Sequence, residues 1–360
     1  MNTATHPNNA PEPAPAARDD AAARAAQIRD RARALALRGD FDAAIAFASS
    51  ENRRARDSQL ERWLVQWRHR AFESRQVSPR RDWPPQVPDL FAGCEGAPEI
   101  EGEQLTAATI GAGILHHGCV IVRGLIAREE AQDLAAEVDC VFDAAKAAVE
   151  GASVEQTLPW YAPLRVRLRN EALHQARAVG YRGAGILTAD SPRLLFDLLE
   201  LYERRRVIAT LTDYLGERPT LSAQKAALRR VPPTTGTDWH QDGAFLGADV
   251  RAVNVWLALS ECGVDAPGLD LMPRRLPAIV ETGTGQAKFR WSVDPAVVDV
   301  AAAGTAVASP VFTPGDAVVF DQLFLHRTGV RPGMTRQRWA IESWFFAPSG
   351  APRDYFPVVV

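Results

Sequence analysis

The chain has 360 residues, of which 46% are hydrophobic and 24% are charged, and its formal net charge is −3. This composition is typical of a soluble globular protein with a sizeable core. The nearly balanced charge argues against a broad nucleic-acid-binding surface. No apolar run approaches the roughly 18 residues that span a bilayer, so we expect no membrane segment.

Four cysteines are widely scattered along the chain, and no two of them form a CxxC pair. This spacing argues against a structural zinc site and is compatible with reduced thiols. The N-terminal residues contain neither the basic segment nor the apolar segment of a secretory signal. We therefore expect a cytoplasmic protein.

Composition divides the chain into four parts. Residues 1–18 are rich in proline, alanine and asparagine, which predicts a disordered tail. Residues 19–78 show helical spacing and predict an α-helical N-terminal extension. A proline-rich stretch predicts a linker over 79–103, and 104–360 form the main domain.

The N-terminal extension is expected to contain three helices. Gly39 ends the first helix, a second begins in 40–49, and a third covers 57–73. The third helix has an apolar stripe at Leu60, Leu64, Trp67 and Phe72. Such helices are expected to pack on the main domain or on a partner.

The main domain changes from helices to strands along its length. Helices are expected over 127–149 and roughly 192–215, and short β runs separated by glycine and proline follow Pro219. Helices followed by an antiparallel double sheet indicate a double-stranded β-helix, which is the jelly roll of cupin-like proteins. The predicted fold class is therefore mainly β with flanking helices.

One short stretch, 238-DWHQDGAF-245, contains a candidate pair of metal ligands. His240 and Asp242 are two residues apart, and on an extended chain such residues point to the same side. One H-x-D tripeptide is unremarkable in a chain with seven histidines. The pair needs a third ligand before it indicates a site.

His326 is the candidate third ligand. It follows the turn and β run of 314-PGDAVVFDQLFLHRTG-329, in a stretch that we expect to be less regular. In a jelly roll, two strands far apart in sequence can be neighbours and bring His326 to His240 and Asp242. Two histidines and one carboxylate form the facial triad of non-haem Fe(II) oxygenases.

An arginine downstream fits the same chemistry. The stretch 335-TRQRWAIESWFF-346 is predicted to be a strand that begins with Arg336 and Arg338. Oxygenases that use 2-oxoglutarate need a cation for its far carboxylate, and arginine can bind a carboxylate with two hydrogen bonds. Either of the two arginines is a candidate for this task.

Five stretches together resemble the phytanoyl-CoA dioxygenase family of Fe(II)/2-oxoglutarate oxygenases. In order, they are GCVIVRGLIAREEAQDLAAEVD, WHQD, VNVWLALSECGVDAPGLDLMP, PGDAVVFDQLFLHRTG and RWAI. The resemblance covers about residues 105–346. It implies that His240, Asp242 and His326 bind iron, and that Arg338, at the start of R-W-A-I, binds the C5 carboxylate of 2-oxoglutarate.

The resemblance also implies further co-substrate contacts. Thr328, two residues after the distal histidine, takes the place of a family hydroxyl that helps to bind the same carboxylate. Trp256 matches an aromatic residue near the co-substrate, and Gln224 is expected to face the pocket from the preceding strand. His69 and His174 lie in polar helical contexts and receive no role.

The implied function is hydroxylation of a small-molecule substrate by Fe(II), 2-oxoglutarate and O₂, with release of succinate and CO₂. The same scaffold could instead catalyse desaturation, ring closure or halogenation, or serve as an inactive jelly-roll binding protein. Neither nucleic acid nor a membrane is expected as a partner. The sequence does not choose the substrate or the oligomeric state.

Overall fold

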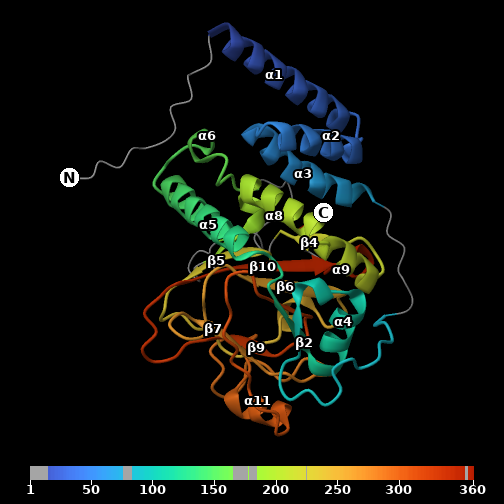
Figure 1. Ribbon diagram of the computed structural model, residues 1–360, viewed down its shortest axis with the longest axis vertical. Helices are drawn as coiled ribbons and strands as arrows, with labels where there is room; N and C mark the ends of the chain where they lie inside the picture. The colour runs from blue at the N-terminus through green and yellow to red at the C-terminus, as the bar shows by residue number, and fades with distance from the viewer. Residues whose placement is uncertain (1–14, 76–82, 165–176, 178–184, 224, 353–355) are drawn as a thin grey trace, which may run out of the picture.

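The computed structural model describes residues 15–75, 83–164, 177, 185–223, 225–352 and 356–360. Figure 1 shows a layer of helices stacked on one side of a β-sheet domain. The first helix begins at Pro15, so it includes the last residues of the predicted disordered tail. The rest of that tail, 1–14, lies outside the described residues.

Three helices form the N-terminal layer, as predicted: α1 (Pro15–Leu37), α2 (Phe41–Arg54) and α3 (Ser58–Ser74). Aspartates cap the second and third, because the Asp40 side chain accepts from the backbone N–H of Ala43 and Asp57 accepts from the first turn of α3. The layer has its own apolar cluster, which includes Leu60, Leu64 and Trp67.

The N-terminal layer packs on the main domain through α3. Arg68 Nη1 donates to the Val359 carbonyl at 2.9 Å, and His69 Nδ1 lies 2.9 Å from the Pro357 carbonyl. Glu61 is fully buried and accepts from Arg193 Nε of helix α8 (Pro192–Arg204) at 2.7 Å. His69, for which no role was expected, lies in α3 as predicted and is buried, because α3 is covered on the side where it meets the C-terminal strand. His174 lies outside the described residues.

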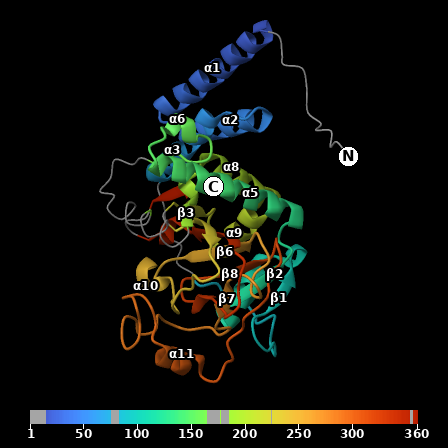
Figure 2. The ribbon, with the colours of Figure 1, turned by 90° about the vertical axis from the view of Figure 1, so that its left-hand side faces the viewer.

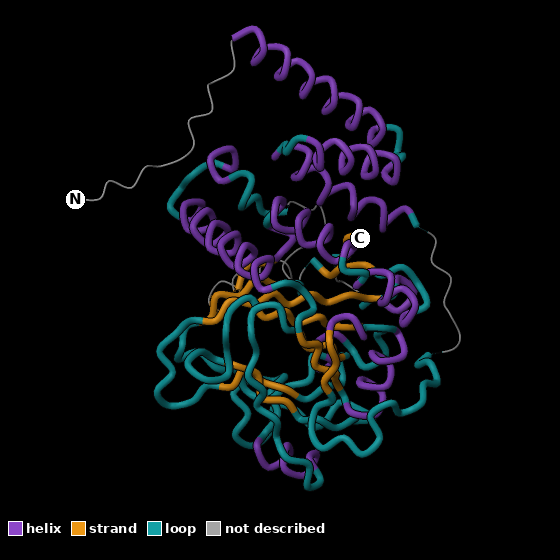
Figure 3. Tube along the Cα trace, viewed as in Figure 1, coloured by secondary structure: helices purple, strands orange, loops and turns teal. Residues whose placement is uncertain are grey.

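Most other helices cover one side of the large sheet (Figure 3). Those predicted over 127–149 and 192–215 are confirmed as α5 and the pair α8 and α9. The helices are α4 (Ala107–Ala112) with a π-helical turn (Gly113–His117), α5 (Arg128–Val149), α6 (Val154–Thr157), α8 (Pro192–Arg204), α9 (Val207–Leu215), α10 (Gly243–Leu246) and α11 (Pro295–Ala302). Helix α11 lies at the end of the molecule opposite α1 (Figure 2).

The described strands form a nine-stranded and a two-stranded sheet. The main path of the large sheet is β1-β2-β8-β6-β10-β4-β11, with β5 on β10 and β3 on β5. The small sheet is β7-β9. The bounds are β1 (Glu99–Glu101), β2 (Cys119–Arg123), β3 (Gly185–Leu187), β4 (Thr220–Ser222), β5 (Ala227–Val231), β6 (Ala252–Ala258), β7 (Gly268–Leu271), β8 (Ala317–Phe320), β9 (His326–Gly329), β10 (Arg338–Phe346) and β11 (Pro357–Val359).

Alternation along the central strands separates two cores. In β6, Val253 and Val255 pack with the helices, whereas Trp256 and Ala258 pack between the two sheets with Leu271 of β7. A strand buried on both faces is apolar throughout, as the run AVNVWLA is. The double-stranded β-helix with a helical N-terminal region is the predicted fold class.

Three strands differ in detail from the prediction. Strand β1 lies within the stretch predicted as a linker, 79–103, and pairs in parallel with β2, so the sheet begins before that stretch ends. Strand β10 begins at Arg338, and Arg336 precedes it. His326 opens strand β9 instead of lying in an irregular stretch, because β9 pairs with β7 across Leu271.

Candidate metal centre

His240 and His326 are held side by side by their own backbones. The N–H of His240 donates to the His326 carbonyl at 3.0 Å, and the N–H of His326 donates back to the His240 carbonyl at 3.1 Å. This reciprocal pair fixes the two histidines opposite each other. The two imidazole centroids are 4.4 Å apart.

Asp242 does not continue the extended chain of His240. Its φ of −63° and ψ of −22° are helical, and it caps α10. Gly243 follows it, where an added Cβ would lie 2.9 Å from the Gln322 carbonyl, and the Gly243 N–H donates to that oxygen at 2.8 Å. The prediction that both ligands lie on one face of a strand is therefore wrong in geometry, although the two side chains meet.

Gln241, between the two candidate ligands, is fully buried and points into the surrounding loops. Its amide nitrogen donates to the Leu323 carbonyl at 2.6 Å and to the Ala278 carbonyl at 3.1 Å. Its oxygen accepts from the Val280 N–H at 2.7 Å. These bonds hold the turn between His240 and the start of α10, because every polar group of the amide has a partner.

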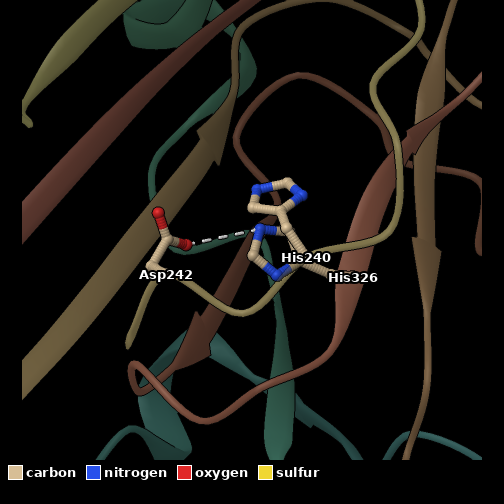
Figure 4. A group of neighbouring side chains, drawn as sticks. All are labelled: His240, Asp242 and His326. Carbon is tan, nitrogen blue, oxygen red and sulfur yellow. Dashed lines mark ion pairs between the residues drawn. The ribbon is translucent and has the colours of Figure 1, made fainter. Parts of the chain in front are cut away.

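The structure brings His240, Asp242 and His326 together (Figure 4). One possible ligand atom from each side chain lies within 4.8 Å of the others. Nδ1 of His240 lies 2.9 Å from the Asp238 carbonyl, and Nδ1 of His326 lies 3.1 Å from the Phe324 carbonyl. A carbonyl oxygen only accepts, so each Nδ1 carries the proton and each Nε2 has a lone pair for a metal.

The electrostatics of the cluster favour a cation between its members. Burial, followed by the neighbouring His326, lowers the pKa of His240 to about 4, so its imidazole is neutral at pH 7. Burial alone would raise the pKa of Asp242, but Lys225 and the two histidines outweigh it and hold the pKa below its usual value. Two imidazoles and one carboxylate suit a divalent transition metal.

Arg338 is a buried cation with an unsatisfied donor. It is 1% exposed, and Nη1 donates to the Gly268 carbonyl at 2.9 Å. Among the described residues, no carboxylate pairs with it, and both its Nε and the indole Nε1 of Trp256 are buried without a hydrogen-bond partner. The guanidinium carbon lies 5.5 Å from the Trp256 ring centroid. Two orphaned donors side by side fit a missing anionic acceptor.

The spacing along β7 between the residues that contact Arg338 and His326 suits a five-carbon dicarboxylate. Gly268, which accepts from Arg338, lies three residues along β7 from Leu271, the residue that pairs with His326. At about 3.3 Å per residue, this separation is about 10 Å. A dicarboxylate that chelates a metal at one end can reach Arg338 with the other.

The other predicted co-substrate residues have different positions. Thr328 lies on the same face of β9 as His326, opposite the core residue Leu269. Trp256 is buried between the sheets. Gln224 lies outside the described residues. Arg336, the rival of Arg338, is exposed and outside the strand.

Sequence reasoning missed two charged features of the centre. Lys225 Nζ lies 3.4 Å from Asp242 Oδ1, whereas His326 Nε2 lies nearest to the other carboxylate oxygen, Oδ2. Arg229 and Glu342 form a two-pronged ion pair on the adjacent strands β5 and β10, with both N–O distances at 3.0 Å. Lysine is so rare in this chain, at three residues, that Lys225 could have been noticed on that ground.

Two imidazoles and one carboxylate within a double-stranded β-helix form the donor set of the non-haem Fe(II) oxygenases. The family model described as Phytanoyl-CoA dioxygenase (PhyH) matches residues 115–331. The chain belongs to this family, and it is a non-haem oxygenase that depends on Fe(II), 2-oxoglutarate and O₂ and acts on a small molecule.

Several solved structures are distantly similar. EctD from S. alaskensis, solved with 2-oxoglutarate and 5-hydroxyectoine, is 15% identical, with 74% of this chain and 88% of that chain covered and a TM-score of 0.46. The carbocyclase SnoK from nogalamycin biosynthesis is 14% identical, with 70% and 87% covered and a TM-score of 0.44. AviO1 from Streptomyces viridochromogenes Tue57 is 17% identical, with 69% and 98% covered and a TM-score of 0.41.

A search of curated proteins found no match. Within the part of the chain that the structure describes, no helix is both long enough and apolar enough to cross a membrane.

Proposed function

We propose that His240, Asp242 and His326 hold Fe(II), and that the enzyme hydroxylates a C–H bond of a small molecule while 2-oxoglutarate becomes succinate and CO₂. The observation that carries this proposal is the pairing of a three-ligand cluster with an unpartnered buried arginine. A metal site alone would suit many proteins. A metal site together with Arg338, whose carbonyl partner Gly268 lies about 10 Å along β7 from Leu271, supports a co-substrate that is both a chelator and a carboxylate.

The residues of the chain have distinct tasks in this proposal. His240 and His326 present Nε2 because backbone carbonyls hold each Nδ1 proton. Arg338 and the Trp256 indole give their unused N–H groups to the C5 carboxylate, and Thr328 adds its hydroxyl. Gln224 is proposed to contact the co-substrate from the same pocket. When bound, Fe(II) supplies the binding and activation of O₂, which no protein side chain provides.

The inner walls of the barrel exclude water from this chemistry. Phe320, 1% exposed, packs against the His326 ring with centroids 4.7 Å apart, and Phe324 stacks on it at 5.9 Å and 8°. An apolar wall behind the ligands limits solvent access and strengthens the charge interactions inside. The burial of Arg338, in contrast to the exposed Arg336, supports Arg338 as the residue that binds 2-oxoglutarate.

The proposal is tested in two steps. Adding 2-oxoglutarate to the anaerobic Fe(II) protein should produce the visible charge-transfer absorption of a chelated 2-keto acid. The absence of this band in protein that has bound iron contradicts the co-substrate site. Succinate that forms faster with a candidate substrate then shows turnover. A product heavier by one oxygen indicates hydroxylation, and a product lighter by two hydrogens indicates desaturation or ring closure.

Two expectations from the sequence remain predictions. One is the division into a helical extension over 19–78 and an oxygenase domain over 104–360, joined by 79–103. The other is a cytoplasmic location. Removing the helical extension and measuring iron binding by the remaining domain would test the first.

A further inference from the structure

Aromatic side chains lead from the surface to the candidate metal centre. Trp291 lies edge-on to the His240 ring, with centroids 5.3 Å apart and planes at 74°. Phe289 stacks parallel to Trp291 at 5.0 Å with an interplanar angle of 3°, and it is 54% exposed. A large exposed ring beside a site is a common sign of ligand binding, because water is an unfavourable neighbour for it.

A tight turn holds these rings in place. The Ser292 N–H donates to the Phe289 carbonyl at 3.1 Å, and the Ser292 hydroxyl oxygen accepts from the Phe289 N–H at 2.9 Å. Ser292 also forms an antiparallel bridge with His240. Trp291 is therefore fixed relative to the ligand His240, and little ordering is needed when a molecule binds against it.

Phe245 and Lys225 complete the same wall. Phe245 follows Asp242 on α10, and its ring lies 6.3 Å from Trp291 at 83°. Lys225 Nζ lies 3.5 Å from the Phe245 centroid and 3.4 Å from Asp242 Oδ1. The ammonium group thus stands where the aromatic wall meets the candidate metal ligands.

The charges near the centre leave a positive excess. Arg229 and Glu342 neutralise each other as a close ion pair. Among the remaining described charges at the site, Lys225 pairs with the single carboxylate of Asp242, and Arg338 donates only to backbone carbonyls. A divalent metal ion and a dianionic co-substrate cancel, so their arrival does not remove the excess. One further anion would balance the site.

We infer that Lys225, Phe245, Trp291 and Phe289 form a substrate subsite, called here the aromatic subsite. It takes a molecule with a flat aromatic body and one anionic group, such as a carboxylate. The rings supply stacking surfaces, and Lys225 supplies a charge-assisted hydrogen bond. This inference rests on the proposed function, because it concerns the substrate of the same centre.

Other ligand chemistries fit the aromatic subsite less well. A cationic substrate would meet the positive excess, and Lys225 already occupies the face of Phe245. A saturated substrate would cover similar area without ring stacking. The inference therefore makes two separable demands on a ligand, which are flatness and a negative charge.

The test uses three matched probes on the anaerobic Fe(II) and 2-oxoglutarate protein, followed by calorimetry. The probes are 2-naphthoate, which is flat and anionic, 2-naphthylmethanol, which is flat and neutral, and decahydro-2-naphthoate, which is anionic and saturated. We expect 2-naphthoate to bind about tenfold more tightly than either of the others. Equal affinities for all three overturn the inference.

Variants assign the effect to the aromatic subsite. Trp291→Leu should weaken 2-naphthoate about tenfold, and Phe289→Leu, at the surface, gives a second variant that is safe for folding. Lys225→Met should remove the preference for 2-naphthoate over 2-naphthylmethanol, and Lys225→Arg should retain it. Lys288→Met is the matched control, because Lys288 pairs with Asp238 at 3.2 Å and is 75% exposed. Unchanged probe affinities in both ring variants overturn the inference.

The charge-transfer band separates this inference from the proposed function. If wild-type protein with bound iron gives no band with 2-oxoglutarate, the proposed function fails. If the band is normal but 2-naphthoate has no advantage, only the aromatic subsite fails. If Lys225→Met abolishes the band, Lys225 acts by supporting Asp242, and its place in the aromatic subsite is overturned.

Discussion

Arg68 in the helical layer and Arg338 in the barrel are both buried arginines, 7% and 1% exposed. Burial lowers the pKa of Arg68 to about 10, and its guanidinium donates to the C-terminal strand. Burial also lowers the pKa of Arg338, but its Nε has no partner in the described part of the chain. Arg68 joins the helical layer to the C-terminal strand, whereas Arg338 has an N–H group that no described residue accepts from. Buried charge therefore serves packing in the helical layer, and in the barrel we propose that it serves ligand binding.

The largest expected effect of a single substitution is at the three proposed metal ligands. His326→Ala removes one of three donors and should weaken Fe(II) binding by well over about 100-fold, since even the partners of metal ligands cost 10- to 100-fold. Iron content after anaerobic loading and desalting measures this. His69→Ala, at a buried histidine of the helical layer, is the matched control and should retain the iron. Full occupancy in His326→Ala would remove His326 from the metal site.

Arg338→Gln should leave iron in place and remove the co-substrate. An anion left without its buried partner costs roughly 3–5 kcal/mol, so the Kd of 2-oxoglutarate should rise by at least about 100-fold. Arg336 is the exposed alternative to Arg338, and Arg336→Gln should change the Kd of 2-oxoglutarate little. Titration of the charge-transfer band in each variant measures the Kd. A normal Kd for Arg338→Gln with a raised Kd for Arg336→Gln would exchange the two roles.

Removing an arginine that pairs with a buried carboxylate of the helical layer should lower the stability of the protein and leave the binding of iron and 2-oxoglutarate unchanged. Arg193→Met leaves the carboxylate of Glu61 buried without its closest cation, and we expect a loss of about 3 kcal/mol in the free energy of unfolding. Urea denaturation of the metal-free protein measures this. Arg53→Met breaks a more exposed pair with Glu200 and should cost less than about 1 kcal/mol. An unchanged midpoint in Arg193→Met would contradict the assignment of this charge to packing.

Glu137 is an exception within the helices, because its Oε2 is buried without a partner in the described residues. Burial, followed by Asp197, raises the pKa of Glu137 to about 7. The folded protein therefore holds this proton more tightly than the unfolded chain, and stability falls as pH rises from about 4.5 to about 7.

Glu137→Gln should consequently stabilise the protein by up to about 3 kcal/mol at pH 8 and by little near pH 4.5. Paired urea titrations of variant and wild type at the two pH values measure the difference. Glu129 lies on the same helix and is exposed. Glu129→Gln should therefore change the free energy of unfolding by less than about 0.5 kcal/mol at both pH values. A stabilisation that does not depend on pH would show that the carboxylate is not the cause.

The repetitive parts of the molecule were predictable from the sequence because local rules govern them. Asp40 and Asp57 stand at the starts of two predicted helices, and β6 is one of the short β runs expected after Pro219. The grouping of His240, Asp242 and His326 was predictable from the order of motifs, since a jelly roll makes distant strands neighbours. Their assignment to iron stays a prediction.

The irregular parts were not predictable, because tertiary contacts decide them. Asp242 adopts a helical conformation at a turn whose Gly243 N–H bonds the Gln322 carbonyl, far along the chain. Trp291 lies in a stretch without periodicity, and tertiary contacts such as the bridge between Ser292 and His240 bring it to the centre. Lys225 lies in the short connection between β4 and β5, where secondary-structure propensity does not predict the direction of a side chain.

The clamp between α3 and β11 has a consequence for biosynthesis. Arg68 and His69 bond to carbonyls that lie 291 and 288 residues later in the chain. On a ribosome that adds about 5–20 residues per second, those helix residues emerge roughly 15 to 60 seconds before their partners exist. During that interval, the side of α3 that meets β11 lacks this partner. The clamp is thus among the last contacts of this protein to form during synthesis.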